Sequence, residues 1–165
     1  MRNERGFLTL AAALPVLGLL LLALGFVFVT EMRAVLALRA DGELRQEVNG
    51  SLRAMLEDAA EAEAVRILAS GSSGGIELHK AAADHAGRCV VAYRVRILDG
   101  CPRLTQGVRS PQPMTGRSEL GEVEVTALDA AMTASGCLHL RLAARSRRTG
   151  HRYEQAAAVP LARLP

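Results

Sequence analysis

The chain has 165 residues, a formal net charge of +3, and 50% hydrophobic but only 3% aromatic residues. This length holds one domain besides an N-terminal segment, and a core poor in aromatic side chains is small, because aromatic residues bury the most area each. The small positive charge, nearly all from arginine, is weak support for a nucleic-acid partner, and the sequence contains no catalytic constellation, so it predicts neither an enzyme nor a cofactor.

The stretch from Gly6 to Thr30 organises the chain, because it contains no charged residue. As a helix, residues 7–30 would extend about 36 Å at roughly 1.5 Å per residue, which exceeds the roughly 30 Å hydrocarbon core of a bilayer. A helix also satisfies its own backbone hydrogen bonds, which lipid cannot do. Arg2 and Arg5 in the short leader favour a cytoplasmic N-terminus. We therefore predict a single-pass protein of the inner (cytoplasmic) membrane, with residues 31–165 outside the cytoplasm.

The next stretch, residues 31–70, continues with strong helix formers and contains no proline. Apolar or small residues recur at steps of three and four, which places them on one face of a helix. We therefore expect one helix from about Phe7 to Leu68, transmembrane in residues 7–30 and amphipathic in residues 31–70. The residues of the expected stripe are Leu44, Val48, Leu52, Met55, Ala59, Ala62, Val65 and Ala69.

Residues 71–75 read GSSGG, which predicts a helix cap and a turn. After it, residues 89–98, 121–128 and 137–146 alternate apolar and polar side chains, as strands with one buried face do. Residues 153–164 are expected to return as a strand after a hairpin tip. The prediction is an α+β, pilin-like fold in which the long helix packs on a small antiparallel sheet of about four strands in residues 71–165.

Three cysteines, Cys89, Cys101 and Cys137, follow the apolar stretch. If the topology is right they lie in an oxidising compartment, where one pair can form a disulfide and one thiol is left over. The closest pair in sequence, Cys89 and Cys101, is the expected bridge. Cys137 can pair with either of them, and a third interpretation is that all three are small buried apolar side chains.

Two further clusters are weighed as sites. His79, Asp84, His85 and Cys89 are close in sequence, but their spacing matches no standard zinc finger, so no metal site is predicted. The densest basic cluster lies on the expected hairpin tip. The first interpretation is a solvated turn, and the weaker alternative is a site for a phosphate-bearing partner such as DNA or for an anionic surface. Its residues are Arg145, Arg147, Arg148, His151 and Arg152.

The N-terminal motif resembles the start of a type IV prepilin or pseudopilin. Residues 2–7 read RNERGF and lead directly into the apolar helix. The resemblance implies that a prepilin peptidase cuts between Gly6 and Phe7, so that residues 1–6 are a leader peptide, and methylates Phe7. It also implies partners, namely other pilin-like subunits that pack through the N-terminal helix. The motif covers about the first thirty residues, and the order of a long helix and then a sheet extends the likeness loosely to the whole chain.

Two positions depart from the family pattern. Major pilins carry a Glu four residues after the methylated Phe, where this chain has Ala11. In the family that Glu pairs with the N-terminal amine of a neighbour, and minor subunits at a filament tip can lack it. Pro15 lies early in the helix, as in the small pseudopilins of tight-adherence secretion systems, but the Glu-Phe that precedes it there is missing here.

The sequence therefore predicts a minor pilin-like structural subunit of a type IV pilus or related secretion filament, placed at the tip. The alternative is an unprocessed single-span envelope protein with a small extracytoplasmic binding domain. A third interpretation is a secreted protein whose signal peptide is cut near Ala23-Leu24-Gly25.

Overall fold

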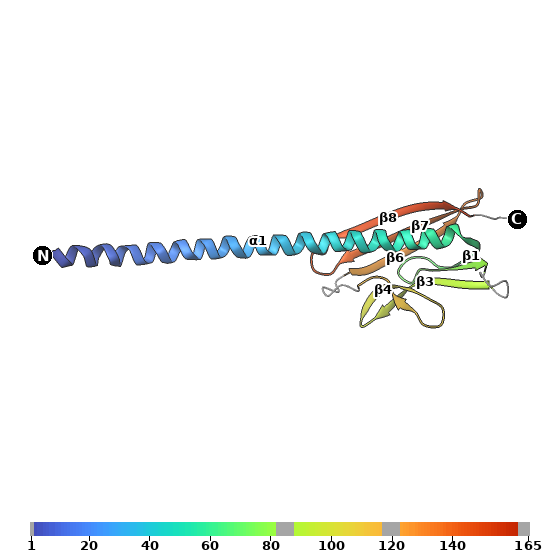
Figure 1. Cartoon of the computed structure of the whole chain (residues 1–165), viewed down its shortest axis with the longest axis horizontal. Coiled ribbons are helices and arrows are strands. Elements are labelled where there is room, and N and C mark those ends of the chain that lie inside the picture. The colour runs from blue at the N-terminus through green and yellow to red at the C-terminus, as the bar shows by residue number, and fades with distance from the viewer. Residues whose placement is uncertain (1, 82–87, 117–122, 162–165) are drawn as a thin grey trace. The chain divides into compact units, whose positions relative to one another are not determined.

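The computed structural model describes residues 2–81, 88–116 and 123–161, and the side chains from residue 13 onward except that of Arg88. The chain divides into two compact units, Met1–Arg39 and Ala40–Pro165. The expected α+β class is confirmed: one long N-terminal helix precedes antiparallel sheets, and its later residues pack on them (Figure 1).

The helix α1 (Arg2–Ala60) supplies the whole described part of the first unit and the first twenty-one residues of the second. The helix continues through Pro15 without a break. The absence of any other proline and the abundance of Ala, Leu, Glu and Arg favour this long helix.

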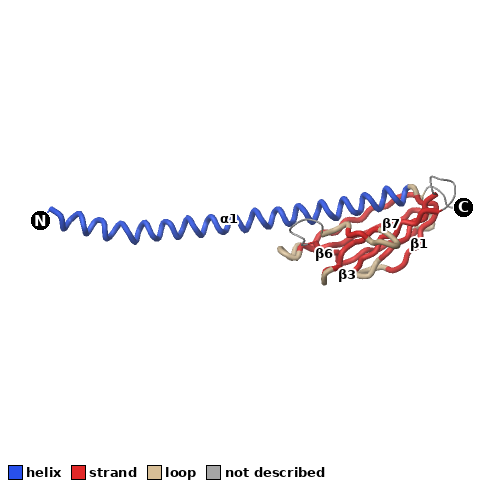
Figure 2. Tube along the Cα trace, turned by 60° about the horizontal axis from the view of Figure 1, so that its bottom comes forward, coloured by secondary structure: helices blue, strands red, loops and turns tan. Residues whose placement is uncertain are grey.

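The second unit contains two antiparallel sheets, seen as the strand-coloured layer in Figure 2. A five-stranded sheet has the order β1-β2-β3-β4-β5, and a three-stranded sheet has the order β6-β7-β8. The strands are β1 (Ala62–Ala69), β2 (Gly75–Ala81), β3 (Arg88–Leu98), β4 (Cys101–Gln106), β5 (Gln112–Pro113), β6 (Val123–Met132), β7 (Cys137–Ser146) and β8 (Arg152–Pro160).

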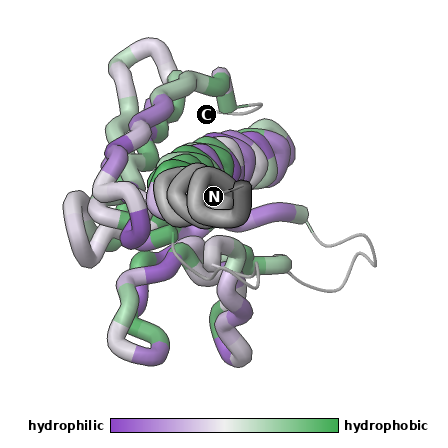
Figure 3. Tube along the Cα trace, turned by 90° about the vertical axis from the view of Figure 1, so that its left-hand side faces the viewer, coloured by the Kyte–Doolittle hydropathy of each residue, from purple (hydrophilic) through white to green (hydrophobic). Residues whose placement is uncertain are grey.

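The core of this unit lies between α1 and the two sheets. Side chains at steps of four, four, three and four along α1 are buried, which is the expected stripe as far as its helical part extends. They meet side chains that alternate along the strands. Figure 3 shows that the strands beside α1 contain both hydrophobic and hydrophilic residues. From α1 the core contains Leu44, Val48, Leu52, Met55 and Ala59; from the strands its largest members include Ile76, Leu78, Tyr93, Leu104, Leu128, Leu138, Leu140 and Leu142.

The strand predictions for residues 89–98 and 137–146 are confirmed by β3 and β7. On β7, Leu138, Leu140 and Leu142 are buried whereas His139 and Arg141 are exposed, as the alternation predicts. The expected strand at residues 121–128 is seen from Val123 onward, and its first two residues lie outside the described part. On β3 the expectation is wrong for Ile97, which is exposed near the β3–β4 turn.

The predicted end of the helix is wrong. The helix α1 ends at Ala60, and residues 62–69 form β1 instead of two further helical turns. The spacing of Ala62, Val65 and Ala69 fits a helix, but β1 gains a full antiparallel partner in β2 directly after the glycine-rich turn. Cross-strand pairing in the tertiary structure therefore overrides local propensity here.

The number and arrangement of the strands also differ from the prediction. The prediction was one sheet of about four strands, whereas the described residues form two sheets. The strands that the sequence analysis did not predict are β1, β2, β4 and β5. The expected turn is confirmed at residues 71–74, but it connects β1 to β2 and does not cap a helix. It docks on β6: Gly71 and Leu128 exchange two backbone hydrogen bonds of 3.1 and 3.0 Å, which link the two sheets.

Gly74 explains why this turn is rich in glycine. A Cβ atom at Gly74 would lie 1.9 Å from the carbonyl oxygen of Leu128, far inside van der Waals contact. Gly71 has φ +87, a conformation that L side chains rarely adopt. Close backbone approach and a positive φ thus both require glycine where the two sheets meet.

Candidate functional site

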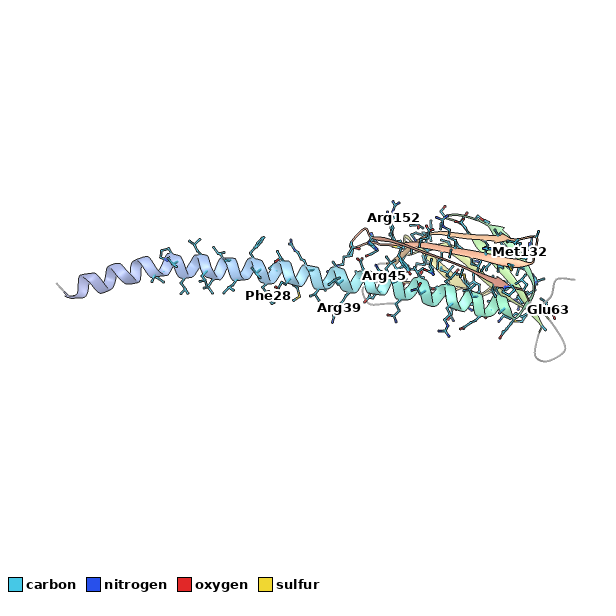
Figure 4. All side chains as sticks on the ribbon, turned by 90° about the horizontal axis from the view of Figure 1, so that it is seen from above. Phe28, Arg39, Arg45, Glu63, Met132 and Arg152 are labelled. Atoms are coloured by element: carbon cyan, nitrogen blue, oxygen red, sulfur yellow. The ribbon has the colours of Figure 1, made fainter. Side chains whose placement is uncertain are left out.

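The first candidate is the apolar surface of α1 between residues 13 and 38. It contains a stretch with a mean hydropathy of 2.5, of which none is buried in the protein. Large side chains such as Leu22 and Phe26 are each 72% exposed, and in Figure 4 that of Phe28 extends away from the ribbon. Such a helix is long and apolar enough to cross a membrane. A continuous exposed apolar surface of this kind requires lipid or another protein to cover it.

The predicted processing site, Gly6 and Phe7, falls at the start of α1. The side chains of residues 2–12, Ala11 among them, lie outside the described part of the chain. Cleavage after Gly6 and methylation of Phe7 therefore stay predictions of the sequence.

The second candidate is the basic hairpin tip, which we define as residues 145–152. The structure confirms the expected hairpin between β7 and β8 and brings all the predicted basic residues onto it. The turn is closed by hydrogen bonds from the Ser146 amide to the His151 carbonyl (2.8 Å) and from the Gly150 amide to the Ser146 carbonyl (2.9 Å). Gly150 has φ +71, which suits the glycine found there.

The arginines of the basic hairpin tip fall into two groups. Arg145 pairs with Glu124 at 2.7 Å and Arg147 lies 4.0 Å from the same carboxylate, so these two charges are partly neutralised. Arg148 and Arg152 are exposed and make no ion pair with any described residue. The unpaired positive charge of the tip therefore lies on Arg148, in the turn, and on Arg152, at the start of β8 opposite Arg145.

The basic hairpin tip is fixed to α1 by two polar contacts. The Thr149 hydroxyl donates a hydrogen bond of 2.8 Å to Asp41, and the Tyr153 hydroxyl donates one of 3.2 Å to Asn49. The guanidinium of Arg45 lies 5.7 Å from the centre of the Tyr153 ring, within the range of a cation–π contact. Figure 4 shows Arg45 and Arg152 in the same region of the unit.

The cysteines do not form the predicted bridge, and all three are free. In the β3–β4 hairpin Cys101 lies opposite Leu98, whereas Cys89 lies nine residues earlier on β3. At about 3.3 Å per strand residue, that separates them by roughly 30 Å, far beyond the Cα separation a disulfide allows. The prediction of a Cys89–Cys101 disulfide is therefore wrong. Cys101 is buried and accepts a hydrogen bond of 3.3 Å from Arg147, whereas Cys89 is exposed and Cys137 half-buried.

The histidine and cysteine cluster at residues 79–89 is only partly described. His79 is half-buried on β2 and Cys89 lies on β3, whereas Asp84 and His85 fall outside the described residues. Within the described part of the chain, no group of three or more His, Cys, Asp or Glu side chains could hold a metal ion.

A polar cluster that the sequence analysis missed lies at the end of α1. Asp58 accepts hydrogen bonds from Lys80 (2.7 Å) and from the Tyr93 hydroxyl, and Lys80 also donates to Glu61 (2.8 Å). Gln106 donates to the Tyr93 oxygen at 3.0 Å. The cluster thus joins α1 to three strands, β2, β3 and β4.

This polar cluster shifts two pKa values. Burial raises the pKa of Tyr93 well above its ordinary value, and the neighbouring Asp58 carboxylate raises it further. Burial disfavours the charged form of Lys80, but its hydrogen bonds to Asp58 and Glu61 outweigh that effect and raise the pKa of Lys80. Both shifts favour the protonated, hydrogen-bonded state, so the hydrogen bonds of the cluster hold α1 on the sheet. Lys80, the single lysine, and Tyr93, a tyrosine on a buried strand face, were the available sequence signals.

An open groove of about 530 Å³ lies beside the second part of α1. It is lined by Glu43, Gln46, Glu47, Gly50, Ser51, Gln106 and Met114. Its described lining thus combines carboxylates, amides, one serine and one methionine. One wall is fixed by the Gly116 amide, which donates a 2.6 Å hydrogen bond to Glu47.

Fold and sites together define an α+β protein whose N-terminal helix is able to cross a membrane. Comparison with protein-family models, with curated proteins and with solved structures found no match for this chain.

Proposed function

We propose that this chain is a structural and assembly subunit: a minor pilin-like protein, held in the inner membrane by the apolar part of α1, with the Ala40–Pro165 unit outside the cytoplasm. The observation that carries the proposal is the change of environment along one helix. Residues 13–38 expose large apolar side chains all round, whereas Leu44, Val48 and Leu52 are buried in the core of the β-rich unit.

A helix of this kind suits a subunit that must be extracted from lipid and packed beside others. Its apolar part would exchange lipid for the matching helices of neighbouring subunits, which bury the same surface. The β-rich unit carries its own core and can be presented on the filament without depending on that packing. The leader with Gly6 and Phe7 supports processing by a prepilin peptidase before assembly.

Ala11 supports a place at the filament tip. An unpaired ammonium in a low-dielectric environment is strongly unfavourable, so each internal subunit needs a carboxylate partner for its N-terminal amine. A chain with Ala11 offers no carboxylate to a neighbour at that position, and this matters least where no subunit lies above it. We therefore propose that the protein is scarce in its filament and sits at one end.

Co-expression with a prepilin peptidase, followed by mass spectrometry of the N-terminal peptide, tests the proposal. The wild-type chain should begin at methylated Phe7, and Gly6→Leu should abolish cleavage. Gly25→Leu is the matched control, because it makes the same substitution at a helix glycine with open space around it and should leave cleavage intact. An intact Met1 in the wild-type chain would contradict processing and favour the unprocessed envelope anchor. A first residue close to Gly25 would favour a cleaved signal peptide.

A further inference from the structure

The basic hairpin tip contributes more positive charge than the net charge of the whole chain. Residues 145–152 contain four of the 20 Lys and Arg residues and none of the 17 Asp and Glu residues. Without these four arginines the formal net charge would fall from +3 to −1. The tip is thus the densest basic cluster of the chain and has no acidic residue of its own to balance it.

Two arginines of the basic hairpin tip are available to bind a partner. Arg148 and Arg152 are exposed and unpaired among the described residues, and two acids, Glu124 and Asp41, contact other residues of this hairpin. Glu124 is 8% exposed and turned to Arg145 and Arg147, while Asp41 accepts from the Thr149 hydroxyl. Neither carboxylate forms an ion pair with Arg148 or Arg152.

The connectivity of the chain limits how far the basic hairpin tip can move from a membrane. Thr30 closes the uncharged stretch, and Asp41, which holds Thr149, follows eleven residues later. Even fully extended, eleven residues span about 40 Å. If the apolar part of α1 is inserted, the tip is tethered within that reach of the lipid headgroups, whatever the orientation of the unit.

We infer that the basic hairpin tip binds the phosphate headgroups of anionic phospholipids in the membrane that holds α1, through Arg148 and Arg152. The inference rests on the membrane insertion in the proposed function and not on cleavage of the leader. Guanidinium groups match phosphate in charge and geometry, and a juxtamembrane basic cluster is attracted to an anionic leaflet. Nucleic acid is the less favoured partner, because Tyr153 is engaged by Arg45 and Asn49 and is not free to stack on bases.

Arginine footprinting on the full chain in lipid nanodiscs tests this inference. Phenylglyoxal modifies accessible guanidinium groups, and mass spectrometry of the digested chain gives a rate for each arginine. In discs that contain phosphatidylglycerol, modification of Arg148 and Arg152 should be about fivefold slower than in discs of pure phosphatidylcholine. At 1 M salt, where the screening length is about 3 Å, the difference should disappear. Arg53 and Arg109, which are also exposed, serve as internal controls and should react equally in both discs.

A matched pair of variants completes the test. Arg147, next to Arg148 in the turn, should share the lipid-dependent protection in the wild-type chain. Arg148→Gln with Arg152→Gln should remove that protection of Arg147, whereas Arg53→Gln with Arg109→Gln should leave it unchanged. Equal rates in the two kinds of disc would overturn the inference while leaving the proposed function intact, and a chain that does not enter discs would overturn both. Protection by inorganic phosphate in neutral discs that equals the lipid effect would show a free-anion site instead. Protection by duplex DNA but not by anionic lipid would assign the tip to nucleic acid.

Discussion

The two parts of α1 have the same backbone conformation and opposite environments. Between residues 13 and 30 every turn is apolar, and most large side chains are at least half exposed. Between residues 40 and 60 the apolar residues Leu44, Val48, Leu52 and Met55 form one stripe that is 3% exposed or less. Leu56 is partly buried beside this stripe, and most charged residues lie on the other faces. The difference teaches that the number of apolar residues and their distribution around the helix, rather than helix propensity, decide whether a helix packs on its own protein or requires another apolar partner.

Charged residues placed in the first part of α1, between residues 13 and 30, should produce the largest effect, which is a loss of membrane insertion. Leu20→Arg combined with Leu24→Arg puts two guanidinium groups one turn apart, and each should oppose insertion by about 2.5–3.5 kcal/mol at a helix centre. We expect the chain to move from the membrane pellet to the soluble or aggregated fraction after carbonate extraction. The variant Leu20→Ala with Leu24→Ala should remain in the pellet. Retention of the double arginine variant would contradict a membrane role for this segment.

The same leucine-to-alanine change should have different effects in the two parts. Leu52→Ala removes a core side chain and should lower the free energy of unfolding of the β-rich unit by about 2–5 kcal/mol. Leu21→Ala, at a 60% exposed position, should leave that free energy unchanged. Urea unfolding in detergent micelles, followed by circular dichroism, measures both. Equal losses in the two variants would mean that the two parts do not differ as described.

The junction of the two sheets should be sensitive to one methyl group. Gly74→Ala forces a Cβ against the Leu128 carbonyl, and relieving that contact should cost about 1–3 kcal/mol of unfolding free energy. Gly50→Ala is the matched control: it lies in a helix with open space around it and should stabilise by up to about 1 kcal/mol. A fully stable Gly74→Ala variant would show that the turn does not approach β6 this closely.

The polar cluster at the end of α1 should make stability fall at high pH. Because the pKa of Tyr93 is raised in the folded state, the unfolded chain loses this proton first, from about pH 10. Its contribution is fully present below that pH and declines as pH rises further, and the raised pKa of Lys80 acts in the same direction. Tyr93→Phe should lower stability at neutral pH by about 1 kcal/mol and reduce the slope above pH 10. Identical alkaline slopes for the two proteins would contradict this account.

Patterns within a single element were predictable from the sequence. The stripe from Leu44 to Ala59, and the alternation of Leu138, Leu140 and Leu142, each depend on one helix or one strand facing one core. The basic hairpin tip could be predicted for the same reason, since the turn and its charges lie in consecutive residues.

Features that depend on distant segments were not predictable in this way. Residues 62–69 carry a helical spacing, and what makes them a strand is pairing with β2 and the contact of Gly71 with Leu128. The cysteine prediction failed because closeness in sequence was equated with closeness in space, whereas a long hairpin separates Cys89 from Cys101. The cluster of Asp58, Lys80 and Tyr93 joins three elements, and no local pattern marks it.

The sidedness of Cys89 tests the central claim most directly, namely that α1 crosses the membrane once and leaves the β-rich unit outside the cytoplasm. Cys89 is exposed, and Cys101→Ser with Cys137→Ser would leave it as the single thiol. After mild reduction, a membrane-impermeant maleimide applied to intact spheroplasts should label this variant as fully as it does after lysis. Labelling that appears only after lysis would place the β-rich unit in the cytoplasm and contradict the account.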